Sequence, residues 1–159
     1  MTNSPLDLLP GYKGYKDLEA RRESDKQARL AVAAELARHT AQLTSAQNDA
    51  LREGGIAYMD ALGTLKTAIQ TLADKISAAP RGYTGLFATH NIQADTLDQV
   101  TAFDRELLNE ATALGPAIEA VEQAMLAGTG QNAAIKAAQT AVKSVATTFE
   151  KRAKLLAGG

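Results

Sequence analysis

Cysteine and tryptophan are absent from this chain of 159 residues, and aromatic residues make up only 4% of it. Without cysteine there is no disulfide framework and no thiolate metal site. No run of about 18 apolar residues occurs, which excludes a helix of the usual membrane-spanning kind. The first residues form neither a cationic nor an apolar segment, so we expect no secretory signal.

An excess of charge of one sign is also missing. The chain has 17 basic and 18 acidic residues, a formal net charge of −1, and 45% apolar residues. The absence of a basic bias argues against a nucleic-acid partner. A near-neutral chain with an ordinary apolar content is not expected to be disordered. The length fits about one domain.

Long stretches of helix-forming residues lie between glycine and proline breaks. We expect helices at about residues 16–53, 56–79, 94–127 and 132–157. No stretch alternates with period two, so we expect no sheet. Pro116 is interpreted as internal to the third helix rather than as its end. Gly54 and Gly55 favour a tight turn, although a weak point inside one straight helix remains an alternative.

Apolar residues in these segments recur at alternating steps of four and three. This spacing is typical of coiled-coil-like helix packing, and we call its members the seam positions. They are Tyr58, Leu62, Leu65, Ile69, Leu72 and Ile76; Leu97, Val100, Asp104, Leu107, Ala111, Leu114, Ile118, Val121 and Met125; and Ile135, Ala138, Val142, Val145, Phe149, Arg152 and Leu156. In the first helix only Leu36, Leu43 and Ala50 stand out. Residues 16–29 are mostly charged, and we expect them to project into solvent or to meet a partner.

The expected fold is therefore all-α. It is an elongated antiparallel four-helix bundle made of two helical hairpins, residues 16–79 and 94–157, joined by a connector at 80–93 and preceded by an N-terminal arm at 1–15. Residues 91–127 contain one basic and seven acidic residues, whereas 128–159 contain five basic and one acidic. This asymmetry predicts an antiparallel second hairpin with complementary flanking charges.

Few residues suggest catalysis. The pair Glu35 and His39, four residues apart, is interpreted as a surface pair on one helix face. The second histidine, His90, belongs to no catalytic motif, and no Glu-x-x-His pair of the di-iron type occurs. We therefore expect no enzyme, metal or cofactor. A carboxylate metal-binding enzyme with a helical-bundle fold remains a second alternative.

Asp104 occupies a seam position between Val100 and Leu107. A buried carboxylate needs hydrogen bonds or a cation. Arg81, Tyr83 and His90 are the nearest candidates in sequence, so we predict that Asp104 holds residues 82–87 against the bundle. Arg152 also occupies a seam position, and we expect it to extend its charge into solvent.

Two short motifs are the strongest candidates for binding. Gly11-Tyr12-Lys13-Gly14-Tyr15 precedes the first hairpin, and Gly82-Tyr83-Thr84-Gly85-Leu86 precedes the second. Tyrosine beside cationic side chains suits a contact surface. The candidate interaction residues are Tyr12, Lys13, Tyr15, Lys16, Arg21, Arg22, Arg81, Tyr83 and Phe87. The alternative is that the tyrosine rings close the ends of the bundle.

The same motifs carry a resemblance. The opening Leu9-Pro10-Gly11-Tyr12-Lys13-Gly14-Tyr15-Lys16-Asp17 and the middle segment Gly82-Tyr83-Thr84-Gly85-Leu86-Phe87 resemble those of an uncharacterised group of bacterial helical proteins. The resemblance implies a bacterial, cytoplasmic, all-helical protein. It implies no activity.

Together these features indicate a non-catalytic interaction or assembly protein, with self-association included, that uses the two glycine-tyrosine segments as contact surfaces. The alternative is a peripheral membrane or granule-surface protein, because residues 132–157 form an amphipathic and basic segment that could lie on an anionic surface.

Overall fold

The computed structural model describes residues 12–52, 55–78 and 94–156, with side chains at 20, 23–52, 55–78 and 98–155. This part of the chain is all-helical and contains no strand. Its elements are α1 (Tyr12–Arg52), a short 3-10 helix η2 (Ile56–Tyr58), α2 (Met59–Ala78), α4 (Ala94–Ala127) and α5 (Gln131–Leu156). None of these helices is long and apolar enough to cross a membrane.

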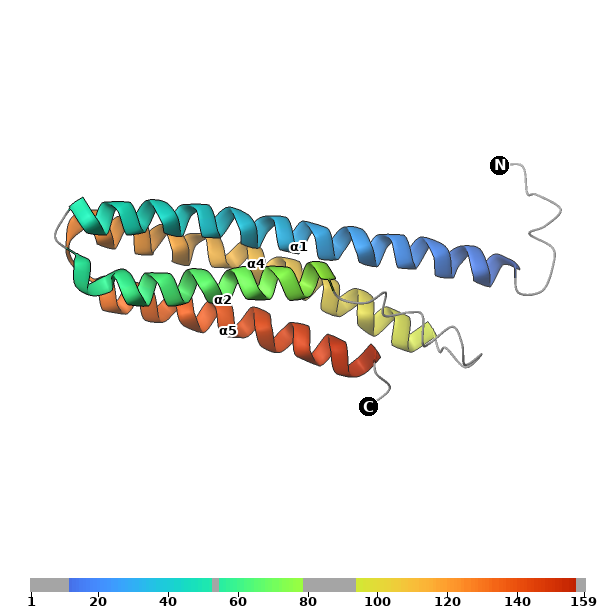
Figure 1. Ribbon diagram of the computed structural model, residues 1–159. Helices are drawn as coiled ribbons and strands as arrows, with labels where there is room; N and C mark the ends of the chain where they lie inside the picture. Colours follow the sequence, from blue (N-terminus) through green and yellow to red (C-terminus); the bar gives the residue numbers. More distant parts are fainter. Residues whose placement is uncertain (1–11, 53–54, 79–93, 157–159) are drawn as a thin grey trace.

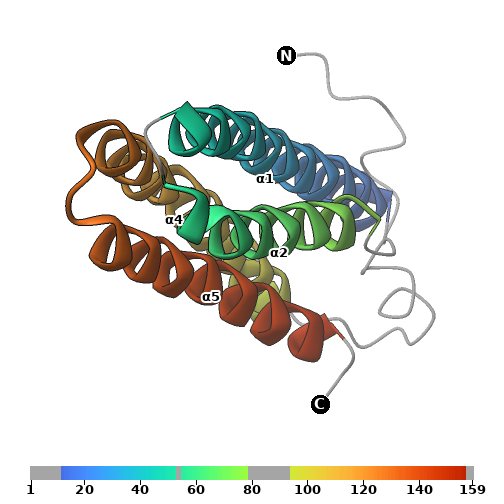
Figure 2. The same cartoon turned by 60° about the vertical axis from the view of Figure 1, so that its left-hand side comes forward.

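The four long helices lie side by side in pairs. Figure 1 shows α1 and α4 running in one direction and α2 and α5 running back. Contacts between α1 and α2, α1 and α4, and α4 and α5 are extensive, whereas α2 and α5 contact each other less. Figure 2 shows the same arrangement after a rotation of 60°. The first and third long helices are therefore neighbours that run parallel.

Most of the expected boundaries agree with the structure. The expected range of the third helix coincides with α4, and Pro116 lies inside it. Because α1 and α2 pack against each other, the chain turns between them, and the single straight helix through Gly54 and Gly55 is wrong. The N–H of Gly55 donates to the carbonyl oxygen of Ala50 at 2.6 Å, which closes the end of α1.

The start of α1 differs from the expectation. We predicted a non-helical arm through Tyr15, but α1 begins at Tyr12 and includes Gly14. One glycine inside a helix costs only about 1 kcal/mol. The long run of helix formers that follows is sufficient to extend the helix through that position. The second glycine-tyrosine segment, residues 82–86, lies outside the described residues.

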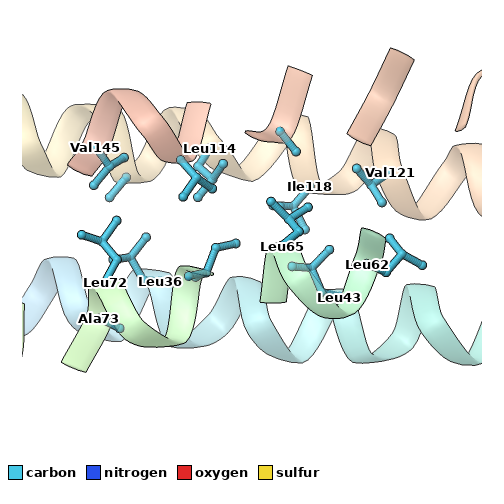
Figure 3. Close-up of a cluster of buried hydrophobic side chains, with 14 of the residues drawn as sticks. Leu36, Leu43, Leu62, Leu65, Leu72, Ala73, Leu114, Ile118, Val121 and Val145 are labelled. Carbon is cyan, nitrogen blue, oxygen red and sulfur yellow. The ribbon is translucent and has the colours of Figure 1, made fainter. Parts of the chain in front are cut away.

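The core consists of the seam positions. Figure 3 shows Leu36, Leu65, Leu114 and Val145 meeting from all four helices. The described seam residues of α2, α4 and α5 are buried, except for Phe149, which is partly buried, as is Tyr58 just before α2. In α1 the buried residues again follow steps of four and three, and they are Asp25, Arg29, Val32, Leu36, His39, Leu43, Ala46 and Ala50, with Asp49 beside them. The α1 seam is thus longer and more polar than predicted.

The helices differ in length. At 1.5 Å per residue, the 41 residues of α1 span about 60 Å and the 20 residues of α2 about 30 Å. Nη1 of Arg29 donates to the carbonyl oxygen of Ile76 at 3.3 Å, near the end of α2. The first turns of α1, before Asp25, therefore extend past α2, as Figure 1 shows.

Candidate functional site

A cluster of four buried charges lies where α2 ends. It consists of Asp25 and Arg29 on α1, Asp104 on α4 and Arg152 on α5, and we call it the charge cluster. The exposed fraction of each residue is between 2% and 8%. Nε of Arg152 donates to Oδ1 of Asp104 at 2.5 Å, and Nη2 of Arg152 contacts Oδ1 of Asp25. Arg152 therefore bridges two carboxylates from two other helices.

Arg29 completes the cluster and joins it to the fourth helix. Its Nε donates to Oδ2 of Asp25 at 3.2 Å, and its Nη1 donates to the carbonyl oxygen of Ile76 on α2. Two carboxylates thus face two guanidinium groups, and the formal charges cancel. Removing one member of such a buried group leaves an uncompensated charge, which costs about 3–5 kcal/mol.

Burial changes the proton affinity of two members. Loss of solvent raises the pKa of Asp104 from 3.8 to about 7, although the positive charge of Arg29 acts in the opposite direction. Loss of solvent also lowers the pKa of Arg152 from its ordinary value to about 10. Both shifts favour the neutral form, so desolvation outweighs attraction at this end of the molecule.

A shallow groove gives access to the charge cluster from outside. It lies between α1 and α4, has a volume of about 250 Å³, and is lined by Ser24, Asp25, Ala28, Thr101, Asp104, Arg105 and Leu108. The carboxyl groups of Asp25 and Asp104 line this groove but already contact guanidinium groups. Solvent in this groove can exchange a proton with the carboxyl group of Asp104.

The charge cluster revises three expectations. Burial of Asp104 at a seam position is confirmed, but its cation is Arg152, and the residues at 82–87 lie outside the described part of the chain. Arg152 does not extend into solvent, because its guanidinium contacts two carboxylates in the core. Asp25 and Arg29, which we expected to project, are buried because they continue the seam of α1.

His39 is a second buried polar residue, so the expected surface position of its pair with Glu35 is wrong, although its Nε2 lies 3.7 Å from Oε1 of Glu35. His39 is fully buried, and its Nε2 lies 3.0 Å from the carbonyl oxygen of Ala111 on α4. Since a carbonyl only accepts, Nε2 carries the proton. Nδ1 lies 3.1 Å from the side-chain amide group of Gln42. The ring lies in the core because His39 continues the spacing that buries Leu36 and Leu43.

The predicted interaction residues are only partly described. Helix α1 contains Tyr12, Lys13, Tyr15, Lys16, Arg21 and Arg22, for which the backbone alone is described. The other three, Arg81, Tyr83 and Phe87, lie outside the described residues. The structure therefore places the first group on one continuous helix, beyond the end of α2.

Sequence reasoning missed Asp25, Arg29 and His39. A signal was present, because all three fall on the four-and-three spacing extended back from Leu43. Their residue types were taken as evidence of exposure. Within the described ranges no group of three or more histidine, aspartate or glutamate side chains is placed to hold a metal ion.

Comparison with known proteins adds no identification: no family model, no curated protein and no solved structure matches this chain.

Proposed function

We propose that this chain is a non-catalytic interaction protein and that the first part of α1 contacts its partner. The observation that supports this is the extension of the first turns of α1, before Asp25, past the end of α2. The four helices would act as the base that holds this segment, in an elongated antiparallel bundle of two hairpins. The four-and-three spacing of the buried residues supports that packing.

The chemistry of the projecting segment suits a protein partner. Tyr12 and Tyr15 are three residues apart, as are Lys13 and Lys16, so each pair shares a helix face. Tyrosine is enriched in the centres of protein interfaces, and arginine such as Arg21 often accompanies it.

A substitution series tests the proposal. Tyr12→Ala together with Tyr15→Ala should weaken association, measured by light scattering after size exclusion, and leave the melting temperature within about 2 °C. The matched control is Ser45→Ala, an exposed position on the same helix alongside α2. If association and melting temperature fall together, the tyrosines have a structural role, and the proposed contact is wrong.

A photoreactive side chain in place of Tyr12 identifies what the segment touches. Irradiation of the purified chain should give a crosslinked dimer if the partner is a second copy. Irradiation in the cell should give a discrete heavier adduct if the partner is another protein. The same side chain in place of Ser45 should give neither product. Equal crosslinking from both positions would contradict a specific contact.

A further inference from the structure

The exposed charges of α5 form a row that faces away from the core. Lys136, Lys143, Lys151 and Lys154 are all exposed. At 100° per residue these four positions fall within an arc of about 80°, on the side opposite the buried seam, and they extend over about 27 Å. Glu150, the single acidic residue of this helix, is exposed on the same side, four residues before Lys154. We call the four lysines the lysine row.

The lysine row forms no ion pair with α4 among the described residues of its own molecule. We expected complementary charges to flank the second hairpin, but the α4–α5 ion pair found in the described part of the chain, Arg152 with Asp104, is buried. None of the four lysines takes part in an ion pair with a described residue. Their positions opposite the seam point them outward, and none of the expected flanking pairs forms among the residues whose side chains the structure describes.

Helix α4 presents the opposite charge. Its exposed or half-buried acidic residues are Asp98, Glu106, Glu110, Glu119 and Glu122, against one exposed basic residue, Arg105. Near the end of α4 these negative charges repel one another. The pKa of Glu122 is raised by burial and by the negative charges of Asp49 and Glu119. A cation brought to this surface would relieve that repulsion.

We propose that the lysine row of α5 in one copy docks on the acidic surface of α4 in a second copy. Because one chain carries both a basic and an acidic surface, a second copy of the chain is favoured as the partner over an unrelated anion. A lipid surface is less well matched, because the large apolar residues of α5, such as Ile135 and Val142, are buried in the core. The contact is independent of the tyrosine segment of α1.

The two surfaces lie on different helices, so the contact is head-to-tail. Such a contact leaves one surface of each end copy open, and the assembly grows unless a ring closes. The exposed charges are screened over about 8 Å at physiological ionic strength. Association should therefore increase with concentration at low salt and weaken steeply as salt is added.

Charge reversal tests this directly by sedimentation velocity on the full chain. The α5 variant Lys143→Glu with Lys151→Glu, and the α4 variant Glu119→Lys with Glu122→Lys, should each associate about tenfold more weakly than the parent. An equimolar mixture of the two should associate again, because each supplies the surface that the other lacks. The matched control, Lys66→Glu with Lys75→Glu on α2, changes the net charge as much as the α5 variant does and should behave as the parent.

Four outcomes overturn the proposal. One is a parent chain that sediments as a monomer at every salt concentration. Another is a mixture of the two reversed variants that stays unassociated although circular dichroism shows both folded. The third is a monomer that binds vesicles containing phosphatidylserine through the lysine row alone, which would assign that row to a membrane. The fourth is a control variant that loses as much association as the α5 variant, which would show that the effect comes from net charge alone.

Discussion

The guanidinium of Arg152 on α5 donates to the carboxylate of Asp104 on α4, and 48 residues separate them in sequence. Both side chains occupy seam positions, where apolar residues are the rule. They meet because the two helices run antiparallel from the short turn at residues 128–130, so that the start of α4 lies beside the end of α5. The contact from Arg152 to Asp25 then ties this hairpin to α1.

Replacing Arg152 should be strongly destabilising. Arg152→Met removes the cation between Asp25 and Asp104, and we expect the free energy of unfolding to fall by about 3–5 kcal/mol. Urea denaturation measures this. The matched control is Lys151→Met, an exposed neighbour, with an expected change within about 0.5 kcal/mol.

A second substitution should recover much of this loss. Asp104→Leu in the Arg152→Met background removes the carboxylate that the first change leaves unpaired, and Asp25 keeps its contact with Arg29. Equal stability of the single and double variants would contradict coupling between the two residues.

The contribution of Asp104 to stability should fall as the pH rises from about 4 to about 7. The pKa of Asp104 is raised from 3.8 to about 7 in the folded chain, so the folded state binds more protons over this interval. The contribution of this group is complete below the unfolded value and is lost as the pH passes the folded value.

Asp104→Asn removes the titration. The difference in unfolding free energy between the parent and this variant should change across that interval and become constant above about pH 8, measured from urea midpoints. A difference that does not vary with pH would show that the carboxyl group of Asp104 titrates normally.

The sequence predicted the apolar part of the fold better than the polar part. Spacing alone located the seam of α4 from Val100 to Met125 and kept Pro116 inside one helix, because periodic burial leaves a periodic pattern. Asp25 and Arg29 lie in the charged segment that we expected to project into solvent or to meet a partner, because a charged residue is normally buried only with a partner. That partner, Arg152, is remote in sequence and cannot be inferred from local spacing.

Neighbour relations between helices were equally hard to predict. A four-and-three spacing states which face of a helix is buried but not which helix covers it. The contact of His39 with the carbonyl of Ala111 requires α1 and α4 to be adjacent, and no periodicity contains that information. The complementary net charges of α4 and α5 correctly indicated that these two helices pack together. The ion pair described between them, Arg152 with Asp104, lies in the core rather than at the flanks.

His39 should be sensitive to substitution although it lies in no catalytic site. His39→Ala removes a fully buried ring and its hydrogen bond to Ala111, and we expect a loss of about 2–4 kcal/mol in unfolding free energy. Arg38→Ala, at the exposed neighbouring position, serves as the control. Nitrogen NMR of the parent should show Nε2 protonated at neutral pH, and a bare Nε2 would contradict the contact.

Two glycines should respond to alanine with opposite signs. Gly115 lies inside α4, and a Cβ there would meet Cε1 of His39 at 3.4 Å, an ordinary contact distance. Gly115→Ala should therefore stabilise the chain, by up to about 1 kcal/mol, through higher helix propensity. Gly128 follows the last residue of α4 with a φ of 71°, and its N–H donates to the carbonyl oxygen of Ala124. Gly128→Ala should destabilise by about 1 kcal/mol, because alanine disfavours that conformation. The melting temperatures of the two variants, compared with that of the parent, test this prediction. Shifts of the same sign would contradict the backbone conformation described for one of the two glycines.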